Sequence, residues 1–268
     1  MEGPQHLKRI LVTGASGQLG LSLQDLAHEH PNLEFIFKNS KDLDITDRER
    51  INKIFEIGGF DYCINCAAYT KVDEAEKNPK MAFNVNAEAV KNLALVCKNN
   101  NVTLIHISTD YVFDGEKGSP YTVDDQPNPI NLYGKSKWEG EKYIQEIWDK
   151  YFIVRTSWLY HKIHGHNFYK TILAKAKKGE ELRITDKEIG CPTNAANLAK
   201  FLLKLILAEN QNFGIYHYSD GQIMSWYRFA LCILEENGLK NTTNIVKDNN
   251  YRSFAHRPKF SVLQILQQ

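Results

Sequence analysis

The sequence predicts an α/β fold in which a parallel, doubly wound sheet carries a smaller C-terminal lobe. Short apolar runs alternate with longer helical patterns through most of the 268 residues. The short runs are apolar at nearly every position, as expected of strands that helices cover on both faces. Beyond about Arg155 the pattern becomes less regular and more aromatic, which indicates segments that leave the sheet. We therefore expect a core over residues 1–155 and a lobe over residues 156–268, with some segments of the latter returning to the core.

The expected elements follow one another in the order that a parallel sheet requires. Strands are expected at Arg9–Thr13, Leu33–Phe37, Tyr62–Asn65, Thr103–Ile107, Phe152–Arg155 and Glu181–Ile184. Helices are expected at Leu19–Ala27, Thr46–Ile57, Pro79–Lys98, Asn131–Trp148, Phe168–Lys177 and Asn194–Leu207. Thr46 and Glu49 have the spacing of a capping box that would open the second helix. The stretch 114–129 is rich in Gly, Pro and Asp, which predicts a loop over the sheet edge.

Composition argues against several classes of partner. The net charge is +1 and no basic block is interleaved with aromatic residues, so neither nucleic acid nor a membrane surface is expected. The chain has no apolar run long enough for a membrane span and no apolar signal core at its start. Its five cysteines suit a reducing cytoplasm. Cys63 and Cys66 form a C-x-x-C, but strand alternation would turn them to opposite faces, which argues against a redox or zinc pair.

A glycine pattern follows the first expected strand and opens the first expected helix. It has the form G-x-x-G-x-x-G, from Gly14 to Gly20. Residues without a Cβ let backbone N–H groups approach a pyrophosphate at the positive end of a helix. This context predicts a Rossmann-type dinucleotide site beyond the carboxyl ends of the strands. The expected cofactor-binding residues here are Gly14, Ser16, Gly17, Gln18, Leu19 and Gly20.

The choice between NADPH and NADH stays open from the sequence. An NAD site usually has an acidic residue about 20 residues further on, at the end of the second strand. This chain has no acid there until Asp42, and Lys38, Ser40 and Lys41 favour the 2′-phosphate of NADP, although a solvated turn explains the lysines equally well. After the third expected strand, the small residues Ala67 and Ala68 would let the backbone lie against the adenosine and ribose, although small residues are also common where elements pack tightly.

Two further motifs carry the candidate chemistry. The segment that begins with Ser108 and Thr109 directly follows the fourth expected strand, and Tyr133 and Lys137 are four residues apart on one helix face. A nearby ammonium would lower the pKa of the tyrosine, the threonine hydroxyl would orient a carbonyl, and the tyrosine would supply the proton. The conjunction with the glycine turn predicts a nicotinamide-dependent reductase with Thr109, Tyr133 and Lys137 as catalytic residues. Ser108 is the poorer candidate because alternation turns it away from Thr109.

Motifs along nearly the whole chain are similar to those of one enzyme family. They are TGASGQLG, DITD, INCAAYTKVDEAE, STDYVFDG, NLYGKSKWEGE, RTSWLY, HNFYKT, GCPTNA, GIYHYSDG and RPKFSVL, in order from about residue 9 to residue 263. With them the chain resembles the dTDP-4-dehydrorhamnose reductase family of extended short-chain dehydrogenases/reductases. The resemblance implies an enzyme of dTDP-rhamnose and cell-wall polysaccharide biosynthesis that reduces dTDP-4-dehydro-L-rhamnose to dTDP-L-rhamnose.

The resemblance also implies a set of binding residues and a substrate-binding role for the C-terminal lobe. Asp44 and Ile45 would face the adenine, although DITD is also a helix-capping run. Arg257 would contact the substrate diphosphate, since a guanidinium suits phosphate oxygens, unless it is a solvated arginine. Trp158 would line the substrate pocket or belong to the core. The implied substrate-binding residues are Thr70, Val72, Thr109, Tyr111, Trp158 and Arg257.

The resemblance implies a possible homodimer and, for some members, magnesium at a dimer interface, but no residue here matches such a site. His161, His164 and His166 have no standard zinc spacing, so a polar loop and no metal site are expected. Relatives continue past the RPKFSVL segment for a short helix or two. The chain is therefore either a short version or one whose end has been lost, which bears on closure of the lobe.

Two alternative functions remain. One is a nucleotide-sugar epimerase or 4,6-dehydratase, which recycles its cofactor without net consumption of NADPH. A dehydratase is expected to have acidic residues after the fourth strand; Asp110 is acidic but Tyr111 is not. The other is a non-enzymatic subunit, since a relative of this family regulates methionine adenosyltransferase. The presence of Tyr133 and Lys137 argues against it.

Overall fold

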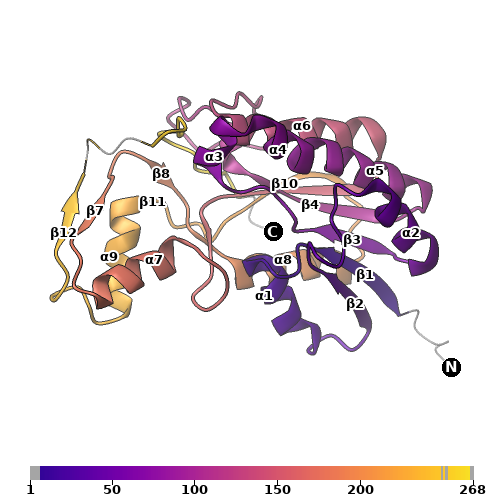
Figure 1. The fold of residues 1–268 in the computed structure, drawn as a ribbon, viewed down its shortest axis with the longest axis horizontal. Coiled ribbons are helices and arrows are strands. Elements are labelled where there is room, and N and C mark those ends of the chain that lie inside the picture. The colour runs from indigo at the N-terminus through magenta and orange to yellow at the C-terminus, as the bar shows by residue number, and fades with distance from the viewer. Residues whose placement is uncertain (1–6, 249, 251–252, 266–268) are drawn as a thin grey trace.

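The computed structural model describes residues 7–248, 250 and 253–265. Within them, a six-stranded parallel sheet forms the centre of the molecule, with strand order β10-β5-β4-β3-β1-β2 (Figure 1). Its strands are β1 (Lys8–Thr13), β2 (Leu33–Lys38), β3 (Tyr62–Asn65), β4 (Thr103–Thr109), β5 (Tyr151–Thr156) and β10 (Gly214–Tyr218). The predicted doubly wound α/β fold is confirmed.

The sixth strand of the sheet is not the one that the sequence pattern indicated. The segment expected as Glu181–Ile184 is β7 (Leu182–Ile184), which pairs with β12 (Ile245–Lys247) outside the central sheet. The sixth place belongs to β10, which follows α8 and pairs with β5 at the sheet edge. The sequence of β10 is GIYHY, and most of its residues are only partly buried. An edge strand of this kind does not need the continuous apolar run that marks the inner strands.

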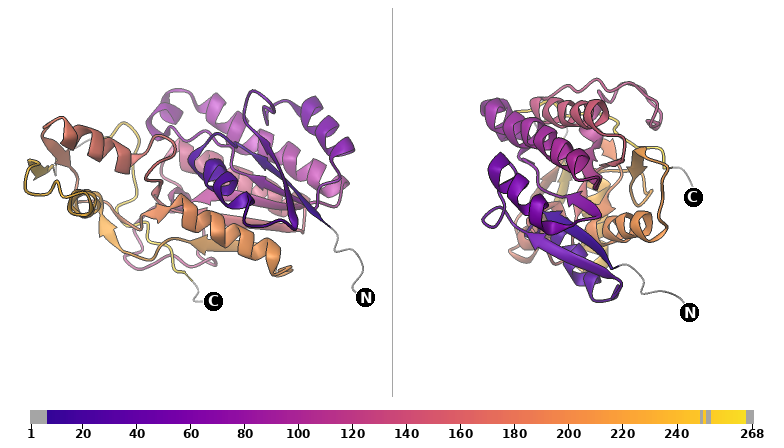
Figure 2. Two further views of the ribbon diagram at one scale, coloured as in Figure 1. Left: turned by 90° about the horizontal axis from the view of Figure 1, so that it is seen from below. Right: turned by 90° about the vertical axis from the view of Figure 1, so that its right-hand side faces the viewer.

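Helices cover both faces of the sheet (Figure 2). On one face, α1 (Gln18–Ala27) and α8 (Ala195–Leu207) bury Leu23 and Leu202 against the strands. On the other, α2 (Arg48–Gly58), α5 (Ala89–Asn99) and α6 (Leu132–Ile147) bury residues such as Ile51, Leu93 and Ile144. Each such side chain contributes about 1.5–3 kcal/mol relative to an exposed one. The two apolar layers hold the strand ends in place.

The N-terminus of α2 differs from the expected capping box. The helix begins at Arg48, two residues later than expected, and its cap is Asp47, whose carboxylate accepts from the Arg50 amide at 3.1 Å. The Thr46 hydroxyl instead donates to Asp44 at 2.8 Å. The interpretation of Thr46 as the cap was therefore wrong, because a carboxylate one position nearer the helix takes that role.

The helix expected over Pro79–Lys98 is divided by a π-helical turn. It consists of α4 (Pro79–Phe83), η1 (Asn84–Glu88) and α5, and it follows a short unpredicted helix, α3 (Val72–Lys77). The buried Asn86 in this turn accepts from the Tyr69 amide at 2.8 Å and donates to the Tyr69 carbonyl at 3.0 Å. Such turns are common near functional sites. This one holds the loop that follows β3.

The smaller lobe has its own apolar cluster. It is built from α7 (Phe168–Lys177), α9 (Trp226–Glu236), β7 and β12, with Ile172, Phe229 and Ile233 at its centre. Two short strand pairs, β6 (Leu159–Tyr160) with β9 (Thr193–Asn194) and β8 (Ile189–Gly190) with β11 (Met224–Ser225), complete the later elements. Residues 114–129 form a loop, as expected. The division into domains at residue 155 stays a prediction.

The cysteines and helices bear on two further expectations. Cys63 packs in the apolar layer of α2 and α5, whereas Cys66 packs against the layer of α1 and α8, which confirms that they face opposite sides of the sheet. All five cysteines are free thiols. Among the helices of the described residues, none combines the length and the apolar character that crossing a bilayer requires.

Candidate active site

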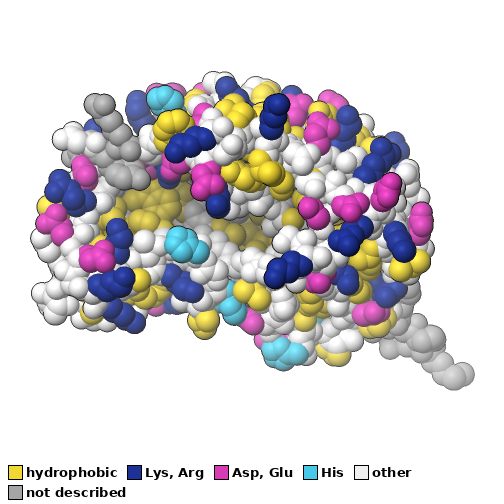
Figure 3. All heavy atoms as spheres, in the orientation of Figure 1, with side chains coloured by type: hydrophobic (Ala, Val, Ile, Leu, Met, Phe, Trp, Pro, Cys, Tyr) yellow, Lys and Arg dark blue, Asp and Glu magenta, His cyan; other side chains and the backbone are white. Residues whose placement is uncertain are grey.

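A cavity of about 860 Å³ lies beyond the carboxyl ends of β1, β3 and β4. The surface is hollowed between the sheet and the lobe, with hydrophobic side chains inside the hollow (Figure 3). Every residue expected to bind cofactor or substrate, or to take part in catalysis, lines this cavity except Arg257. The fold therefore gathers segments that lie far apart in the sequence at a single site.

The turn between β1 and α1 requires its glycines. Gly14 has a φ of +64°, and a Cβ there would lie 2.6 Å from the Ala67 nitrogen. A Cβ at Gly20 would lie 2.6 Å from the Ala15 Cα. Gly17 is the N-cap of α1 and has no side chain with which to cap it, so the first amides of the helix are available to a ligand. This geometry fits the pyrophosphate of a dinucleotide.

The neighbouring wall suits the adenosine end of such a cofactor. Ala67 and Ala68 line the cavity after β3, and Asp44 and Ile45 line it before α2. Asp44 also accepts from the amide and hydroxyl of Thr46, so both interpretations of the DITD segment are compatible with its position. At the end of β2, Ser40 borders the cavity, whereas Lys38 and Lys41 are not among its described lining residues.

The end of β4 separates Ser108 from Thr109. The Ser108 hydroxyl donates to the buried carboxylate of Glu141, which pairs with Arg155 at 2.7 Å. Thr109 points the other way; its Oγ1 accepts from the Tyr111 amide and donates to Asp110, both at 3.1 Å. Alternation therefore turns Ser108 toward a buried ion pair and leaves Thr109 at the start of the loop.

The first turn of α6 places Tyr133 beside Thr109. The N-cap Asn131 accepts from the Gly134 amide at 2.7 Å. A Cβ at Gly134 would lie 2.1 Å from the Tyr111 carbonyl oxygen, so the helix approaches the β4 loop closely. The rings of Tyr111 and Tyr133 meet edge to face, with centroids 6.0 Å apart.

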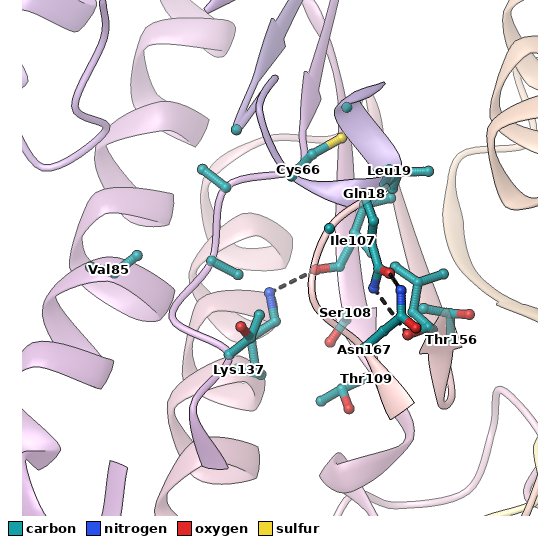
Figure 4. Close-up of a pocket in the computed structure, with 18 of the residues that line it drawn as sticks. Gln18, Leu19, Cys66, Val85, Ile107, Ser108, Thr109, Lys137, Thr156 and Asn167 are labelled. Carbon is teal, nitrogen blue, oxygen red and sulfur yellow. Dashed lines mark hydrogen bonds between the residues drawn. The ribbon is translucent and has the colours of Figure 1, made fainter. Parts of the chain in front are cut away.

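Lys137 is buried one helical turn further along, with 2% of its surface exposed. Its ammonium nitrogen donates to the Ile107 carbonyl at 2.7 Å (Figure 4) and lies 3.1 Å from His106 Nε2. Burial lowers the pKa of Lys137 to about 8, while the charge of Glu141 acts in the opposite direction. Lys137 is therefore directed toward the sheet as well as toward the cavity.

The expected lowering of the tyrosine pKa is not what the structure shows. Burial raises the pKa of Tyr133 to about 12, although a hydrogen bond with Thr109 opposes the rise. The lysine charge that was expected to stabilise the phenolate is directed to the β4 carbonyl. The physical reason is that desolvation disfavours the anion more than its neighbours favour it. Tyr133 is thus held as a phenol, the form that can donate a proton.

Asp110 is a buried acid beside this pair that the sequence reasoning assigned no role. Burial raises its pKa to about 7, and hydrogen bonds from Ser261 and Thr109 oppose the rise. The Ser261 hydroxyl, from the RPKFSVL segment, donates to it at 2.5 Å. The signal in the sequence is an acid directly after a buried strand. Near neutral pH this carboxyl can change its charge within the site.

Two tryptophans form the lobe side of the cavity. The rings of Trp158 and Trp226 are stacked with centroids 3.6 Å apart and an interplanar angle of 6°. A Cβ at Gly190 would lie 2.5 Å from the Trp158 ring, so this glycine leaves room for the stack. Trp158 lines the cavity, which agrees with the pocket interpretation, and Trp226 joins it from α9. No local pattern connects two residues so far apart in the sequence.

The loop 161–167 joins the lobe to the glycine turn. Asn167 donates to the Gln18 side chain at 3.1 Å (Figure 4), and His164 lies 2.7 Å from the Asp25 carboxylate of α1. Asp25, His161 and His164 are close enough to hold an ion. However, His161 Nδ1 accepts from the amides of Ile163 and His164, so it is engaged in the loop turn. His161 thus stabilises the turn of the loop, His164 joins the loop to α1, and His166 lines the cavity.

Arg257 is the one expected residue that does not line the cavity in the described part of the chain. Its guanidinium pairs with Asp73 of α3 at 3.0 Å, and the same carboxylate accepts from the Ala255 amide at 2.9 Å. Its charge nevertheless acts on Tyr111 and on Glu188, two groups whose pKa burial raises. Arg257 therefore lies near the cavity, but its guanidinium is paired with the Asp73 carboxylate.

Comparisons with known proteins agree with this arrangement. The family model described as "RmlD substrate binding domain" matches residues 8–268. A dTDP-4-dehydrorhamnose reductase of Aggregatibacter actinomycetemcomitans is 37% identical, covering 97% of this chain and 91% of the relative. The spore coat polysaccharide biosynthesis protein SpsK of Bacillus subtilis is 38% identical over 96% of this chain and 89% of its own length.

A solved structure shows the same similarity in three dimensions. The dTDP-4-dehydrorhamnose reductase of Bacillus anthracis, crystallised in complex with NADP, superposes with a TM-score of 0.92 and 38% identity, covering 97% of this chain and 91% of that one. The match of the family model over nearly the whole chain, together with these relatives, identifies the family. The chain belongs to the dTDP-4-dehydrorhamnose reductase family of extended short-chain dehydrogenases/reductases.

Proposed function

We propose that this protein uses NADPH to reduce the 4-keto group of dTDP-4-dehydro-L-rhamnose to the hydroxyl group of dTDP-L-rhamnose. One observation carries the proposal. A single cavity joins the open N-terminus of α1, which suits a pyrophosphate, to Thr109, Tyr133 and Lys137. Relatives that match nearly the whole chain are named for this reaction.

The side chains supply the proton and the positioning for this reaction. Bound NADPH supplies the hydride that reaches the sugar C4. Tyr133, held as a phenol, gives its proton to the carbonyl oxygen, so that hydride and proton together convert C=O to CH–OH. The Thr109 hydroxyl orients that oxygen, and Lys137 helps to hold the nicotinamide end of the cofactor. General acid catalysis of this kind contributes about 10²–10⁴-fold to a rate.

The opposite wall supports recognition of the sugar and the nucleotide. The part of the Trp158–Trp226 stack that lines the cavity offers an apolar surface to a deoxysugar or a base. Arg257 lies close enough to act on Tyr111, and its guanidinium suits a diphosphate if the pair with Asp73 opens or is shared. Thr70, Val72 and Tyr111 complete the wall.

The direct test is an NADPH-oxidation assay with a panel of nucleotide-linked 4-keto sugars. We expect stoichiometric loss of NADPH absorbance with dTDP-4-dehydro-L-rhamnose. Conversion of the sugar without net loss of NADPH would instead support an epimerase or dehydratase. NADPH binding with no conversion of any sugar would support the regulatory subunit.

We propose NADPH rather than NADH as the preferred cofactor. Ser40 borders the cavity at the end of β2, where an NAD enzyme usually has an acid. Ser40→Asp should repel the 2′-phosphate and raise the KM for NADPH about tenfold or more, with a smaller change for NADH. Steady-state kinetics with both cofactors measures the ratio, and an unchanged ratio would remove Ser40 from cofactor selection.

We further propose that the enzyme acts in the cytoplasm as a homodimer. Its five free thiols suit a reducing compartment. The homodimer is an expectation from the family resemblance. Light scattering of the purified protein measures its mass in solution, and a monomer mass would contradict the dimer.

A further inference from the structure

A buried chain of hydrogen bonds leads from Lys137 away from the cavity and into the sheet. Lys137 Nζ lies 3.1 Å from His106 Nε2, and His106 Nδ1 lies 3.0 Å from Asn65 Nδ2. The Asn65 carbonyl oxygen accepts from the Thr13 hydroxyl at 2.6 Å. All four side chains are at most 2% exposed, and they come from α6, β4, β3 and β1. Of these four side chains, the proposed reaction uses only Lys137.

The hydrogen bonds of Asn65 determine where the imidazole proton lies. Its carbonyl oxygen accepts from the Thr13 hydroxyl and from the Ala67 amide at 3.3 Å. Because a backbone amide can only donate, the Ala67 contact fixes the oxygen on that side, and the Asn65 nitrogen donates to His106 Nδ1. Burial, and then the charge of Lys137, lower the pKa of His106 well below its usual value, so the ring is neutral. A neutral imidazole has one N–H. With Nδ1 as the acceptor, that proton is on Nε2, the atom that faces Lys137.

An imidazole N–H cannot accept a hydrogen bond from an ammonium, but it can donate to the lone pair of an amine. The contact with His106 thus favours the uncharged form of Lys137. The Ile107 carbonyl, which accepts from Nζ at 2.7 Å, is compatible with either form.

Other charged and titratable groups also lie around Lys137. Glu141, one turn further along α6, favours the charged form, but it shares its charge with Arg155 of β5. Tyr133 on α6 and Asp110 after β4 line the same cavity as Lys137, and burial keeps the pKa of Tyr133 high. The pKa of Lys137 is thus lowered to about 8, toward neutral pH.

We propose that His106 is a positioning residue for Lys137: held by Asn65 with its proton on Nε2, it orients the lysine amine and biases it toward the uncharged form. The inference rests on the proposed function, because the reductase reaction gives Lys137 its role. Its consequence is that the charge beside Tyr133 responds to pH within the working range. Burial lowers the pKa of Lys137 toward this range, and the contact with His106 acts in the same direction.

Asn65→Asp tests the proposal by reversing the tautomer. A carboxylate accepts at both oxygens, so His106 would donate from Nδ1 and Nε2 would become an acceptor for the Lys137 ammonium. We expect the titration midpoint of Lys137 to rise by about one pH unit or more. Carbon-13 NMR of lysine Cε reads this midpoint, with Lys137→Arg to assign the signal. The alkaline limb of kcat/KM for NADPH oxidation should move by the same amount.

A matched control separates the tautomer from the added charge. In a His106→Phe background the ring remains but both nitrogens are lost, so Asn65→Asp can act on Lys137 only through space. Its effect there should be less than about half of the effect beside His106. Equal shifts in both backgrounds, or no shift in either, would overturn the proposal.

Two further measurements keep the outcomes distinct. Melting temperature and NADPH binding show whether each variant folds. If Asn65→Asp does not fold, Asn65→Ala is the substitute, because it removes the donor to Nδ1 and should still raise the titration midpoint of Lys137. An unchanged midpoint in that variant would contradict the proposal. The NMR titration needs no turnover. A wild-type protein that fails to oxidise NADPH with any 4-keto sugar would therefore refute the proposed function while the titration of Lys137 still tests the role of His106.

Discussion

The two halves of the cavity are built in different ways. The cofactor half comes from strand ends and helix starts between Thr13 and Lys137, where the backbone itself forms the surface. The sugar half comes mostly from the later part of the chain, where the Trp158–Trp226 stack supplies side chains, together with Thr70, Val72 and Tyr111. The loop 161–167 joins this half to α1 of the cofactor half. Backbone surfaces depend on the positions of glycines and strands, whereas side-chain surfaces depend on distant packing.

This difference predicts which kinetic constants each half of the cavity controls. Changes in the cofactor half should affect the binding of NADPH, and changes in the sugar half should affect the KM of the sugar. Tyr133 lies where the halves meet, so its loss should affect kcat. Four variants test this separation, in order of decreasing expected effect.

Tyr133→Phe should have the largest effect. It removes the proton donor while retaining the ring that meets Tyr111 edge to face. We expect kcat to fall by about 10²–10⁴-fold, with NADPH affinity unchanged in a fluorescence titration. A variant that turns over at wild-type rates would exclude Tyr133 as the acid.

Gly14→Ala should weaken NADPH binding about tenfold or more, because its Cβ would lie 2.6 Å from the Ala67 nitrogen and its backbone has a φ of +64°. Gly118→Ala is the matched control, since Gly118 has a φ of +72° but a Cβ there meets nothing within 4 Å. Calorimetric titration with NADPH compares the two. Equal losses of affinity would mean that an alanine at positive φ weakens NADPH binding through the fold as a whole, and not through the contact of Gly14 with Ala67.

Trp226→Ala should raise the KM for the sugar about threefold to tenfold, since it removes one face of the stack, and aromatic pairs contribute about 0.5–1.5 kcal/mol beyond their buried area. The KM for NADPH should not change. Trp148→Phe serves as the control, because Trp148 donates to the Val102 carbonyl and is not among the lining residues. A larger change in the KM for NADPH than in that for the sugar would contradict the separation of the halves.

His164→Ala should have the smallest effect, because it removes only the partly exposed pair with Asp25 that ties the loop 161–167 to α1. Such pairs contribute about 0.2–1 kcal/mol, so the KM for NADPH should rise no more than about fivefold. Lys162→Ala, which removes a pair with Glu236 inside the lobe, should leave that KM unchanged. If both variants behave alike, the bridge between loop and helix has no role in cofactor binding.

The sequence by itself determined the parallel sheet, the glycine turn and the spacing of Tyr133 and Lys137. These are local properties: apolar runs identify inner strands, Gly14 and Gly20 mark a turn that a Cβ would block, and a spacing of four residues places two side chains on one helix face. For the same reason, the weakly patterned edge strand β10 was missed.

Only the tertiary structure decided how the site residues are paired and charged. The stacking of Trp226 on Trp158, the pairing of Arg257 with Asp73 and the chain through His106 join segments that no local pattern relates. The pKa of Tyr133 is raised because burial removes water from around the phenol, and burial depends on the whole fold. Local periodicity specifies backbone geometry, whereas desolvation and long-range contacts arise only when the elements pack together.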